Sequence, residues 1–206
     1  MGLYKNIIFP WSYDLILRMP TLDKWREKVL KNAKGDILEI GIGTGQNLPY
    51  YPKEVKRITA IEPNPGMHKQ IKKKLPDLEI EVDLHLCSST KLPFEDNSFD
   101  SVISTLVLCS IEELSTALNE IKRVLKPEGS FLFFDHGKSC DAHIYKWQKR
   151  LNPFWMAIGD GCKLDVPIEE EIKKAGFSIS HLEKFYLEKA PKTHAYVYTG
   201  VAKKTN

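Results

Sequence analysis

The stretch Leu38-Glu39-Ile40-Gly41-Ile42-Gly43-Thr44-Gly45 decides the fold, because an apolar strand runs directly into a glycine-rich turn. Glycine adopts positive φ angles without steric cost and lets another molecule approach the backbone closely. The spacing is G-x-G-x-G, and Gln46 stands where the dinucleotide fingerprint requires a third glycine. Alone, the string fits either a tight strand-to-helix turn or a ligand-binding loop, so the surrounding residues must decide.

Strand-like and helix-like segments alternate on both sides of this turn, which favours a parallel α/β sheet. Strands are predicted at 36–40, 57–61, 79–86, 99–104, 130–134, 179–187 and 193–202. Helices are predicted at 21–33, 67–74, 114–125 and 167–175, the third of them with a capping box made by Ser110 and Glu113. We therefore expect one α/β domain over residues 1–206: a Rossmann-like, seven-stranded, mostly parallel sheet with an antiparallel C-terminal strand and helices on both faces.

The composition of the chain excludes several classes of protein. Its 206 residues suffice for one domain with a full-sized core, and 42% hydrophobic and 28% charged residues are ordinary for a soluble protein. No apolar run reaches the roughly 18 residues of a membrane span, and the first 20 residues lack the pattern of a secretory signal. A net charge of +3 is too small to indicate nucleic-acid binding. We expect a cytoplasmic protein with no transmembrane segment and no nucleic-acid partner.

The four cysteines, Cys87, Cys109, Cys140 and Cys162, show no C-x-x-C spacing, and no histidine lies at zinc-finger spacing from them. The sequence therefore predicts no metal site and reduced thiols.

Two acidic residues accompany the glycine turn. Glu62 ends the second predicted strand, about 20 residues after Gly41, where an acid can accept hydrogen bonds from the ribose hydroxyls of an adenosine cofactor. Glu39 lies within an apolar run, and a buried carboxylate needs partners. We expect Glu39 to face backbone amides or an ammonium group.

These residues, with Leu92-Pro93-Phe94, Ser98-Phe99-Asp100 and the segment 124–129, resemble the class I S-adenosylmethionine-dependent methyltransferases over residues 36–135. The resemblance implies S-adenosylmethionine as cofactor and S-adenosylhomocysteine as product. It implies that the glycine loop touches the methionine part, Glu62 the ribose, residues 87–89 the adenine, and Thr105 and Leu106 the amino group. The cofactor-binding residues expected in full are Glu39, Gly41, Gly43, Gly45, Asn47, Glu62, Pro63, Ser88, Ser89, Thr105 and Leu106.

This chain differs from the pattern of the family at the residues expected to contact adenine. Many family members carry an acid after the third strand that binds the adenine amine, whereas this chain has Cys87-Ser88-Ser89. Backbone groups or serine hydroxyls must then serve instead.

Two short blocks are similar to the methyltransferase-like protein 7 group, whose members methylate small thiols. They are Thr105-Leu106-Val107-Leu108-Cys109-Ser110 and Asp160-Gly161-Cys162 after an aromatic segment. The resemblance implies a small-molecule methyl acceptor, with a thiol as the leading candidate, and a thiol with a pKa of about 8.5 is partly ionised without a base.

His136 and Asp160 are the candidate catalytic residues, with His136 as a general base oriented by Asp135 or Asp160. The alternatives are that His136 is a satisfied histidine at a strand end and that Asp160 braces its loop.

Two segments flank this predicted site. The methyltransferase-like protein 7 group typically carries a long hydrophobic N-terminal anchor, whereas residues 1–19 mix apolar residues with Lys5, Pro10, Asp14 and Arg18. We expect residues 1–33 to form a helical lid or simply to pack, with contact to a membrane surface as the alternative. The aromatic insertion 138–164 either roofs the site or packs on the core. The oligomeric state stays open.

Other functions remain compatible with the sequence. The acceptor can be a lipid headgroup, a quinone or another small amphiphile, and the cysteines raise arsenite methylation. A non-catalytic cofactor-binding protein with the same fold is the alternative of a different class.

Overall fold

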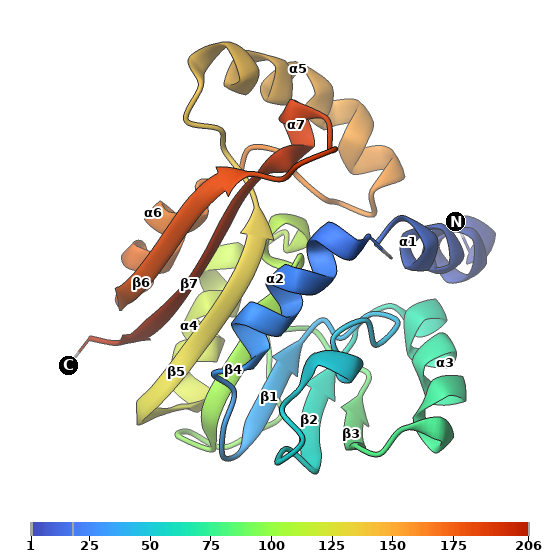
Figure 1. The fold of residues 1–206 in the computed structure, drawn as a ribbon, viewed down its shortest axis with the longest axis vertical. Helices are drawn as coiled ribbons and strands as arrows, with labels where there is room; N and C mark the ends of the chain where they lie inside the picture. The colour runs from blue at the N-terminus through green and yellow to red at the C-terminus, as the bar shows by residue number, and fades with distance from the viewer. Residues whose placement is uncertain (1, 18, 206) are drawn as a thin grey trace.

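The computed structural model describes residues 2–17 and 19–205, and its centre is a seven-stranded sheet in the order β3-β2-β1-β4-β5-β7-β6 (Figure 1). The strands are β1 Ile37–Ile40, β2 Arg57–Ile61, β3 Glu81–His85, β4 Phe99–Thr105, β5 Leu125–His136, β6 Phe177–Tyr186 and β7 Tyr196–Lys204. Strands β1 to β5 pair in parallel, and β7 is antiparallel to both β5 and β6. The predicted Rossmann-like sheet with an antiparallel C-terminal strand is confirmed.

Helices cover both faces of this sheet, as expected. The helices of the described chain are α1 Phe9–Ile16, α2 Pro20–Leu30, α3 Pro65–Lys74, α4 Leu114–Val124, α5 Ala142–Ile158, α6 Ile168–Lys174 and α7 Lys192–Ala195, with the short helical turns η1 Tyr4–Ile8, η2 Leu48–Tyr50, η3 Leu75–Asp77 and η4 Leu108–Ser110. Leu30 of α2 and Ile71 of α3 belong to one buried apolar cluster. Leu118 of α4 and Ile172 of α6 belong to a second one. These two clusters are the hydrophobic cores on the two faces.

The predicted capping box before α4 is wrong. Ser110 belongs to η4, and Glu113, at the N-cap position of α4, makes no side-chain capping hydrogen bond. Strand β5 is also longer than predicted, because it starts at Leu125 directly after α4 and runs through Pro127. A shift in the register between β4 and β5 after Phe99 accommodates these extra residues.

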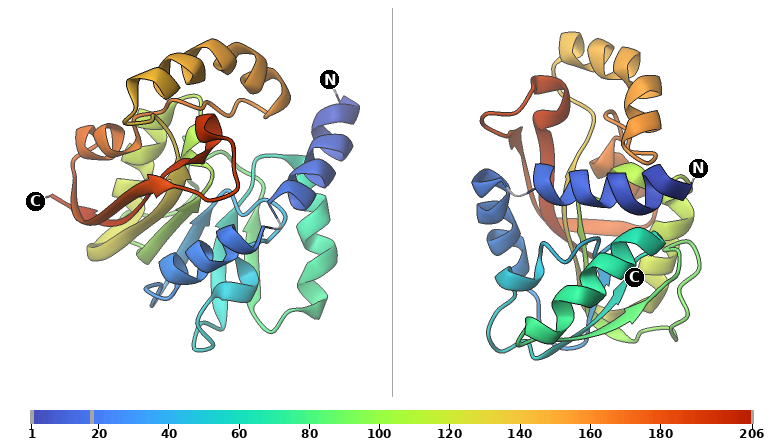
Figure 2. Two further views of the ribbon diagram at one scale, coloured as in Figure 1. Left: turned by 45° about the horizontal axis from the view of Figure 1, so that its top comes forward. Right: turned by 90° about the vertical axis from the view of Figure 1, so that its right-hand side faces the viewer.

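The N-terminal segment of η1 and α1 is helical and lies beside α3, at the carboxyl ends of the strands (Figure 2). Asp14 fastens it there, because its carboxylate accepts hydrogen bonds from Thr44 and Gln46 of the glycine loop and from Lys74 of α3. Although burial raises the pKa of Asp14, the bonds from Thr44 and Lys74 hold it at about 2. Met1 and Arg18 of the predicted segment 1–33 lie outside the described residues.

The predicted insertion 138–164 consists mainly of α5, which stands beyond the carboxyl ends of the strands (Figure 1). Gln148 is its buried residue, whereas the aromatic side chains of Trp147 and Phe154 are exposed. Trp155 of the same helix is half-buried and packs edge-on against His194, with 4.2 Å between the ring centroids. Across residues 2–17 and 19–205, no helix combines the length and apolar character needed to cross a membrane.

Candidate active site

A cavity of about 310 Å³ lies at the carboxyl ends of β1, β2 and β4, where open α/β sheets bind ligands. Its lining comprises Phe9, Tyr13, Ile40, Gly41, Gly43, Ile61, Glu62, Pro63, Asn64, Met67, Ser88, Ser89, Thr90, Leu106, Val107, Ser110, Ile111, Glu112, Glu113, Gly159 and Asp160. Of the predicted cofactor-binding residues, Gly41, Gly43, Glu62, Pro63, Ser88, Ser89 and Leu106 are in this lining. The structure thus brings together predicted residues from four separate segments of the chain.

The three glycines of the loop have positive φ angles but different neighbours. A Cβ at Gly41 (φ 65°) would lie 2.7 Å from both γ-carbons of Val107, which follows β4 in the chain. The backbone at Gly41 is therefore too close to Val107 to carry a side chain. A Cβ at Gly43 (φ 58°) would meet nothing nearer than 3.7 Å, because this residue faces the cavity. Gly45 (φ 82°) lies against Leu48 instead, so it shapes the turn and does not line the cavity.

Glu62 is held as an acceptor at the end of β2. Its carboxylate accepts hydrogen bonds from the backbone N–H groups of Gly43, at 2.9 Å, and of Asn64, at 2.8 Å. The residue is 5% exposed, and burial raises the pKa of its carboxyl to about 7. A carboxylate accepts about four hydrogen bonds, so it retains sites for the hydroxyls of a ligand in the cavity.

Glu39 lies below the cavity and has partners other than those expected. Its carboxylate accepts hydrogen bonds from the Tyr51 hydroxyl, at 2.8 Å, and from the Asn47 side-chain amide, at 2.9 Å. Asn47 also donates to Thr105, at 3.1 Å. The expectation of backbone amides or an ammonium group was wrong, since a phenol and an amide satisfy this acid. Among the predicted cofactor-binding residues, Glu39 and Asn47 are buried and Thr105 is half-buried, and their hydrogen bonds form a network that supports the loop.

The lid of the cavity comes from the N-terminal segment. Phe9 and Tyr13 of α1 contribute to the lining, and the Tyr13 hydroxyl donates a 3.3 Å hydrogen bond to the carbonyl of Leu106. Burial raises the pKa of Tyr13 well above its usual value, so the hydroxyl stays protonated. The sequence indicated a lid but not these two residues, because an amphipathic pattern does not say which side chains reach a ligand site.

The two candidate catalytic residues have separate partners. Asp160 lines the cavity, and its carboxylate pairs with Lys5 at 2.7 Å and accepts from the Asn64 side chain at 3.3 Å. His136 instead contacts Cys162, with 3.2 Å between Nε2 and Sγ. Although burial lowers the pKa of His136, the negative charge of Cys162 raises it overall. Among the described residues, neither Asp135 nor Asp160 is hydrogen-bonded to His136, because Asp135 accepts the N–H groups of Val107 and Leu108. Asp160 instead connects the N-terminal segment to the end of β2.

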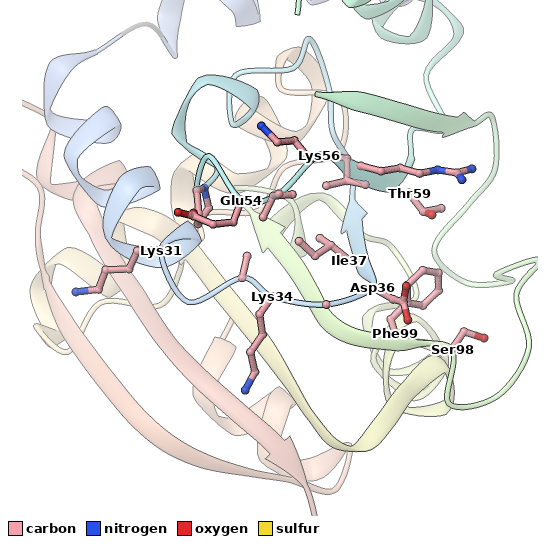
Figure 3. A pocket seen from close by; sticks show the side chains of 15 residues that line it. Lys31, Lys34, Asp36, Ile37, Glu54, Lys56, Thr59, Ser98 and Phe99 are labelled. Carbon is pink, nitrogen blue, oxygen red and sulfur yellow. The ribbon is translucent and has the colours of Figure 1, made fainter. Parts of the chain in front are cut away.

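A larger hollow of about 710 Å³ lies at the opposite, amino ends of the strands (Figure 3). Its lining comes from the segments before β1, β2 and β4 and includes Lys31, Asp36 and Glu54. Open α/β sheets bind their ligands at the carboxyl ends of the strands and not at the amino ends. We therefore assign the site to the smaller cavity.

Comparisons with known proteins identify the family of the chain. The family model described as "Methyltransferase domain" matches residues 38–133. Thiol S-methyltransferase TMT1A from Homo sapiens is 33% identical over 174 residues, which cover 81% of this chain and 71% of that protein. The chain belongs to the class I S-adenosylmethionine-dependent methyltransferases, in the methyltransferase-like protein 7 group. Thiol S-methyltransferase TMT1B from Rattus norvegicus is 36% identical over 162 residues, which cover 76% of this chain and 66% of that relative, just under two thirds of its length.

Solved structures agree on the fold. A structure described as a "possible histamine N-methyltransferase" from Thermotoga maritima superposes with a TM-score of 0.70 and 18% identity over 98% of this chain and 99% of that one. At that level of identity the similarity shows the fold alone.

The residues of the cavity fit the cofactor that the family implies. Gly43 faces the cavity without a side chain, and Glu62 presents a buried carboxylate beside it. Glu62 would hold the ribose hydroxyls, and the backbone of Gly41 and Gly43 would lie against the methionine part. Ser88 and Ser89 line the cavity where the resemblance places adenine, and the Ser88 hydroxyl already hydrogen-bonds Thr90.

Substituting Gly66 by alanine is expected to detach the lid. A Cβ at this position of α3 would lie 2.2 Å from the carbonyl oxygen of Asn6 in η1, a backbone atom that cannot rotate away. Overpacking of this kind costs about 1–3 kcal/mol, so backbone hydrogen exchange in residues 4–16 should become about tenfold faster or more. Gly2→Ala in the same segment is the control, since its Cβ would meet only the Asn6 side chain at 3.9 Å. Equal exchange in both variants would show that the lid is not held at Gly66.

Proposed function

We propose that this protein transfers a methyl group from S-adenosylmethionine to a small thiol. S-adenosylmethionine supplies, when bound, an activated methyl group on a sulfonium. The chain's own residues hold the cofactor through Glu62 and the glycine loop. Phe9 and Tyr13 cover the cavity and exclude water from it, which favours transfer to an oriented acceptor over side reactions.

The residues that line the cavity favour a thiol as the methyl acceptor. Within the described part of the chain, this lining contains no histidine, lysine or cysteine, and two of its four acids, Glu112 and Glu113, are exposed to solvent. Asp160 is already paired with Lys5, and Glu62 is engaged by two backbone N–H groups. An acceptor that ionises unaided suits such a site, and a thiol with a pKa of about 8.5 does so near neutral pH, unlike an alcohol. The relatives named thiol S-methyltransferase support the same acceptor.

The decisive experiment compares a small alkyl thiol with the alcohol of the same carbon skeleton. S-adenosylhomocysteine formation is measured with each acceptor, beside a reaction without acceptor and a direct measurement of cofactor binding. We expect turnover with the thiol alone, rising with pH as the thiol ionises. Cofactor binding without thiol turnover would overturn the thiol as acceptor while leaving the family assignment intact.

A second candidate acceptor is a membrane-borne amphiphile such as a quinone or lipid headgroup. The observation behind it is an apolar surface around the lid. Exposed side chains there include Leu3, Ile7, Trp11, Leu15, Phe154 and Ile158, and the Tyr4 hydroxyl bonds the Ile158 carbonyl at 2.6 Å. An exposed apolar patch of this extent marks an interaction site in many proteins. Turnover with vesicles that carry the amphiphile, but not with soluble thiols, would favour this acceptor.

A further inference from the structure

Two cysteines and a histidine meet beside the cavity although they are far apart in the sequence. Cys109 lies in η4, His136 ends β5, and Cys162 follows α5. The Cys109 and Cys162 sulfurs are 3.5 Å apart, and the His136 Nε2 is 3.2 Å from the Cys162 sulfur. All three potential ligand atoms lie within 4.8 Å of one another.

These distances are close to those around a bound zinc ion. With Zn–S bonds of about 2.3 Å and Zn–N bonds of about 2.0–2.1 Å, tetrahedral angles separate two sulfurs by about 3.8 Å and a sulfur from a nitrogen by about 3.6 Å. These two pairs would each lengthen by a few tenths of an ångström to admit the ion, and the Cys109 sulfur and the His136 nitrogen, which lie within 4.8 Å of each other, would have to reach about 3.6 Å. A disulfide would instead require the two sulfurs to approach to about 2.05 Å.

We propose that Cys109, His136 and Cys162 bind one zinc ion. Two thiolates and an imidazole are the ligands that zinc prefers, and the two negative charges balance the ion in a buried site. Cys109 is 2% exposed, so an uncompensated charge there would be costly. Three protein ligands leave a fourth coordination position to water or another small ligand.

The backbone around the cluster is fixed by bonds that do not involve the ion. The Lys163 N–H donates to the Cys109 carbonyl at 2.9 Å, which joins the segments of the two cysteines. The Asp135 carboxylate accepts the N–H groups of Val107 and Leu108, at 2.8 and 2.6 Å, which fixes η4 against the end of β5. The ligands are therefore positioned in advance, as metal sites require.

The ion would stabilise one wall of the active site. Ser110 and Val107, next to Cys109 in sequence, line the cavity, and so do Asp160 and Gly159 on the segment of Cys162. A zinc ion would join these two stretches to each other and to β5. This inference concerns metal binding and does not depend on which acceptor is methylated.

The test is the zinc content of the full, tag-free chain. After removal of metals with a chelator, the chain is titrated with Zn²⁺, and bound metal is measured by elemental analysis. Titration with Co²⁺ gives a second readout, because thiolate-to-cobalt charge-transfer absorption reports the sulfur ligands directly. We expect about one zinc per chain, and loss of stoichiometric binding in Cys162→Ser and His136→Gln.

The chain offers matched controls. Cys140→Ser and His143→Gln change an exposed cysteine and an exposed histidine outside the cluster, and both should retain zinc. Circular dichroism of the metal-free variants separates loss of a ligand from loss of folding. Absence of zinc from the folded parent chain would overturn the proposal whatever the variants do. Loss of two thiols on mild oxidation of the parent, abolished by Cys109→Ser, would then assign the pair to a disulfide.

Discussion

Replacing Glu62 by glutamine is expected to weaken binding of S-adenosylmethionine by about 10- to 100-fold. Hydrogen bonds to a charged acceptor contribute about 1.5–3 kcal/mol, and 1.4 kcal/mol corresponds to a factor of ten. The carboxylate of Glu62 now accepts hydrogen bonds from the backbone N–H groups of Gly43 and Asn64. A glutamine would point its NH₂ group at one of these two N–H groups, so two donors would face each other. Isothermal titration calorimetry with the cofactor measures the effect.

Glu112→Gln is the matched control for this change, because Glu112 is an exposed acid that lines the same cavity. Exposed charges contribute about 0–1 kcal/mol, so its effect should stay below about fivefold. Equal losses in the two variants would mean that charge in the cavity, and not the position of Glu62, governs binding.

The pH dependence of binding provides a separate check on Glu62. Burial raises the pKa of this carboxyl to about 7, whereas the ribose hydroxyls need the ionised form as acceptor. Affinity should therefore be constant well above pH 7, fall through pH 7 on acidification, and approach a tenfold loss per pH unit well below 7. The Glu62→Gln variant cannot titrate at this position, so its affinity should lack this fall. An identical slope in both proteins would assign the titration to another group.

Substituting Gly41 by alanine should destabilise the protein by about 2–5 kcal/mol. The left-handed backbone at φ 65° costs an alanine about 1–2 kcal/mol, and the Cβ would lie 2.7 Å from the Val107 γ-carbons, where overpacking adds about 1–3 kcal/mol. Urea denaturation followed by circular dichroism gives the free energy of unfolding.

Two further variants separate these contributions. In a Val107→Ala background the two 2.7 Å contacts are removed and the nearest Val107 atom is its Cβ at 3.3 Å, so Gly41→Ala should cost mainly the backbone strain of about 1–2 kcal/mol. Gly43→Ala has φ 58° but only ordinary van der Waals contacts at its Cβ, and its main effect should be on cofactor affinity. If Gly41→Ala costs no more than Gly43→Ala, the loop yields at Val107 and the clash is not a constraint.

The residues that could be predicted from the sequence are those whose signal is local. The glycine turn and Glu62 stand at fixed positions after two apolar strands, and the structure lines the cavity with Gly41, Gly43 and Glu62. The two C-terminal strands were likewise evident from their patterning, although only the structure shows that β7 inserts between β5 and β6.

The residues that could not be predicted depend on contacts between distant segments. Nothing near Lys5 in the sequence indicates that it pairs with Asp160, so Asp160 was assigned to catalysis beside His136. Spacing rules for metal ligands apply to cysteines on one local motif, whereas Cys109 and Cys162 are brought together by η4 and the segment after α5. The capping box failed because the chain forms η4 before it enters α4.

The insertion of β7 between β5 and β6 has a consequence for the order in which the protein can assemble. Strand β6 precedes β7 in the chain, yet its partner in the sheet is β7 alone. During synthesis β6 therefore emerges without a neighbour, and β5 keeps an unpaired edge until β7 arrives. Exposed strand edges of this kind recruit other chains. During synthesis there is thus a stage at which β5 and β6 each have an unpaired edge, because β7 has not yet formed. Chaperones would protect the nascent protein most at this stage.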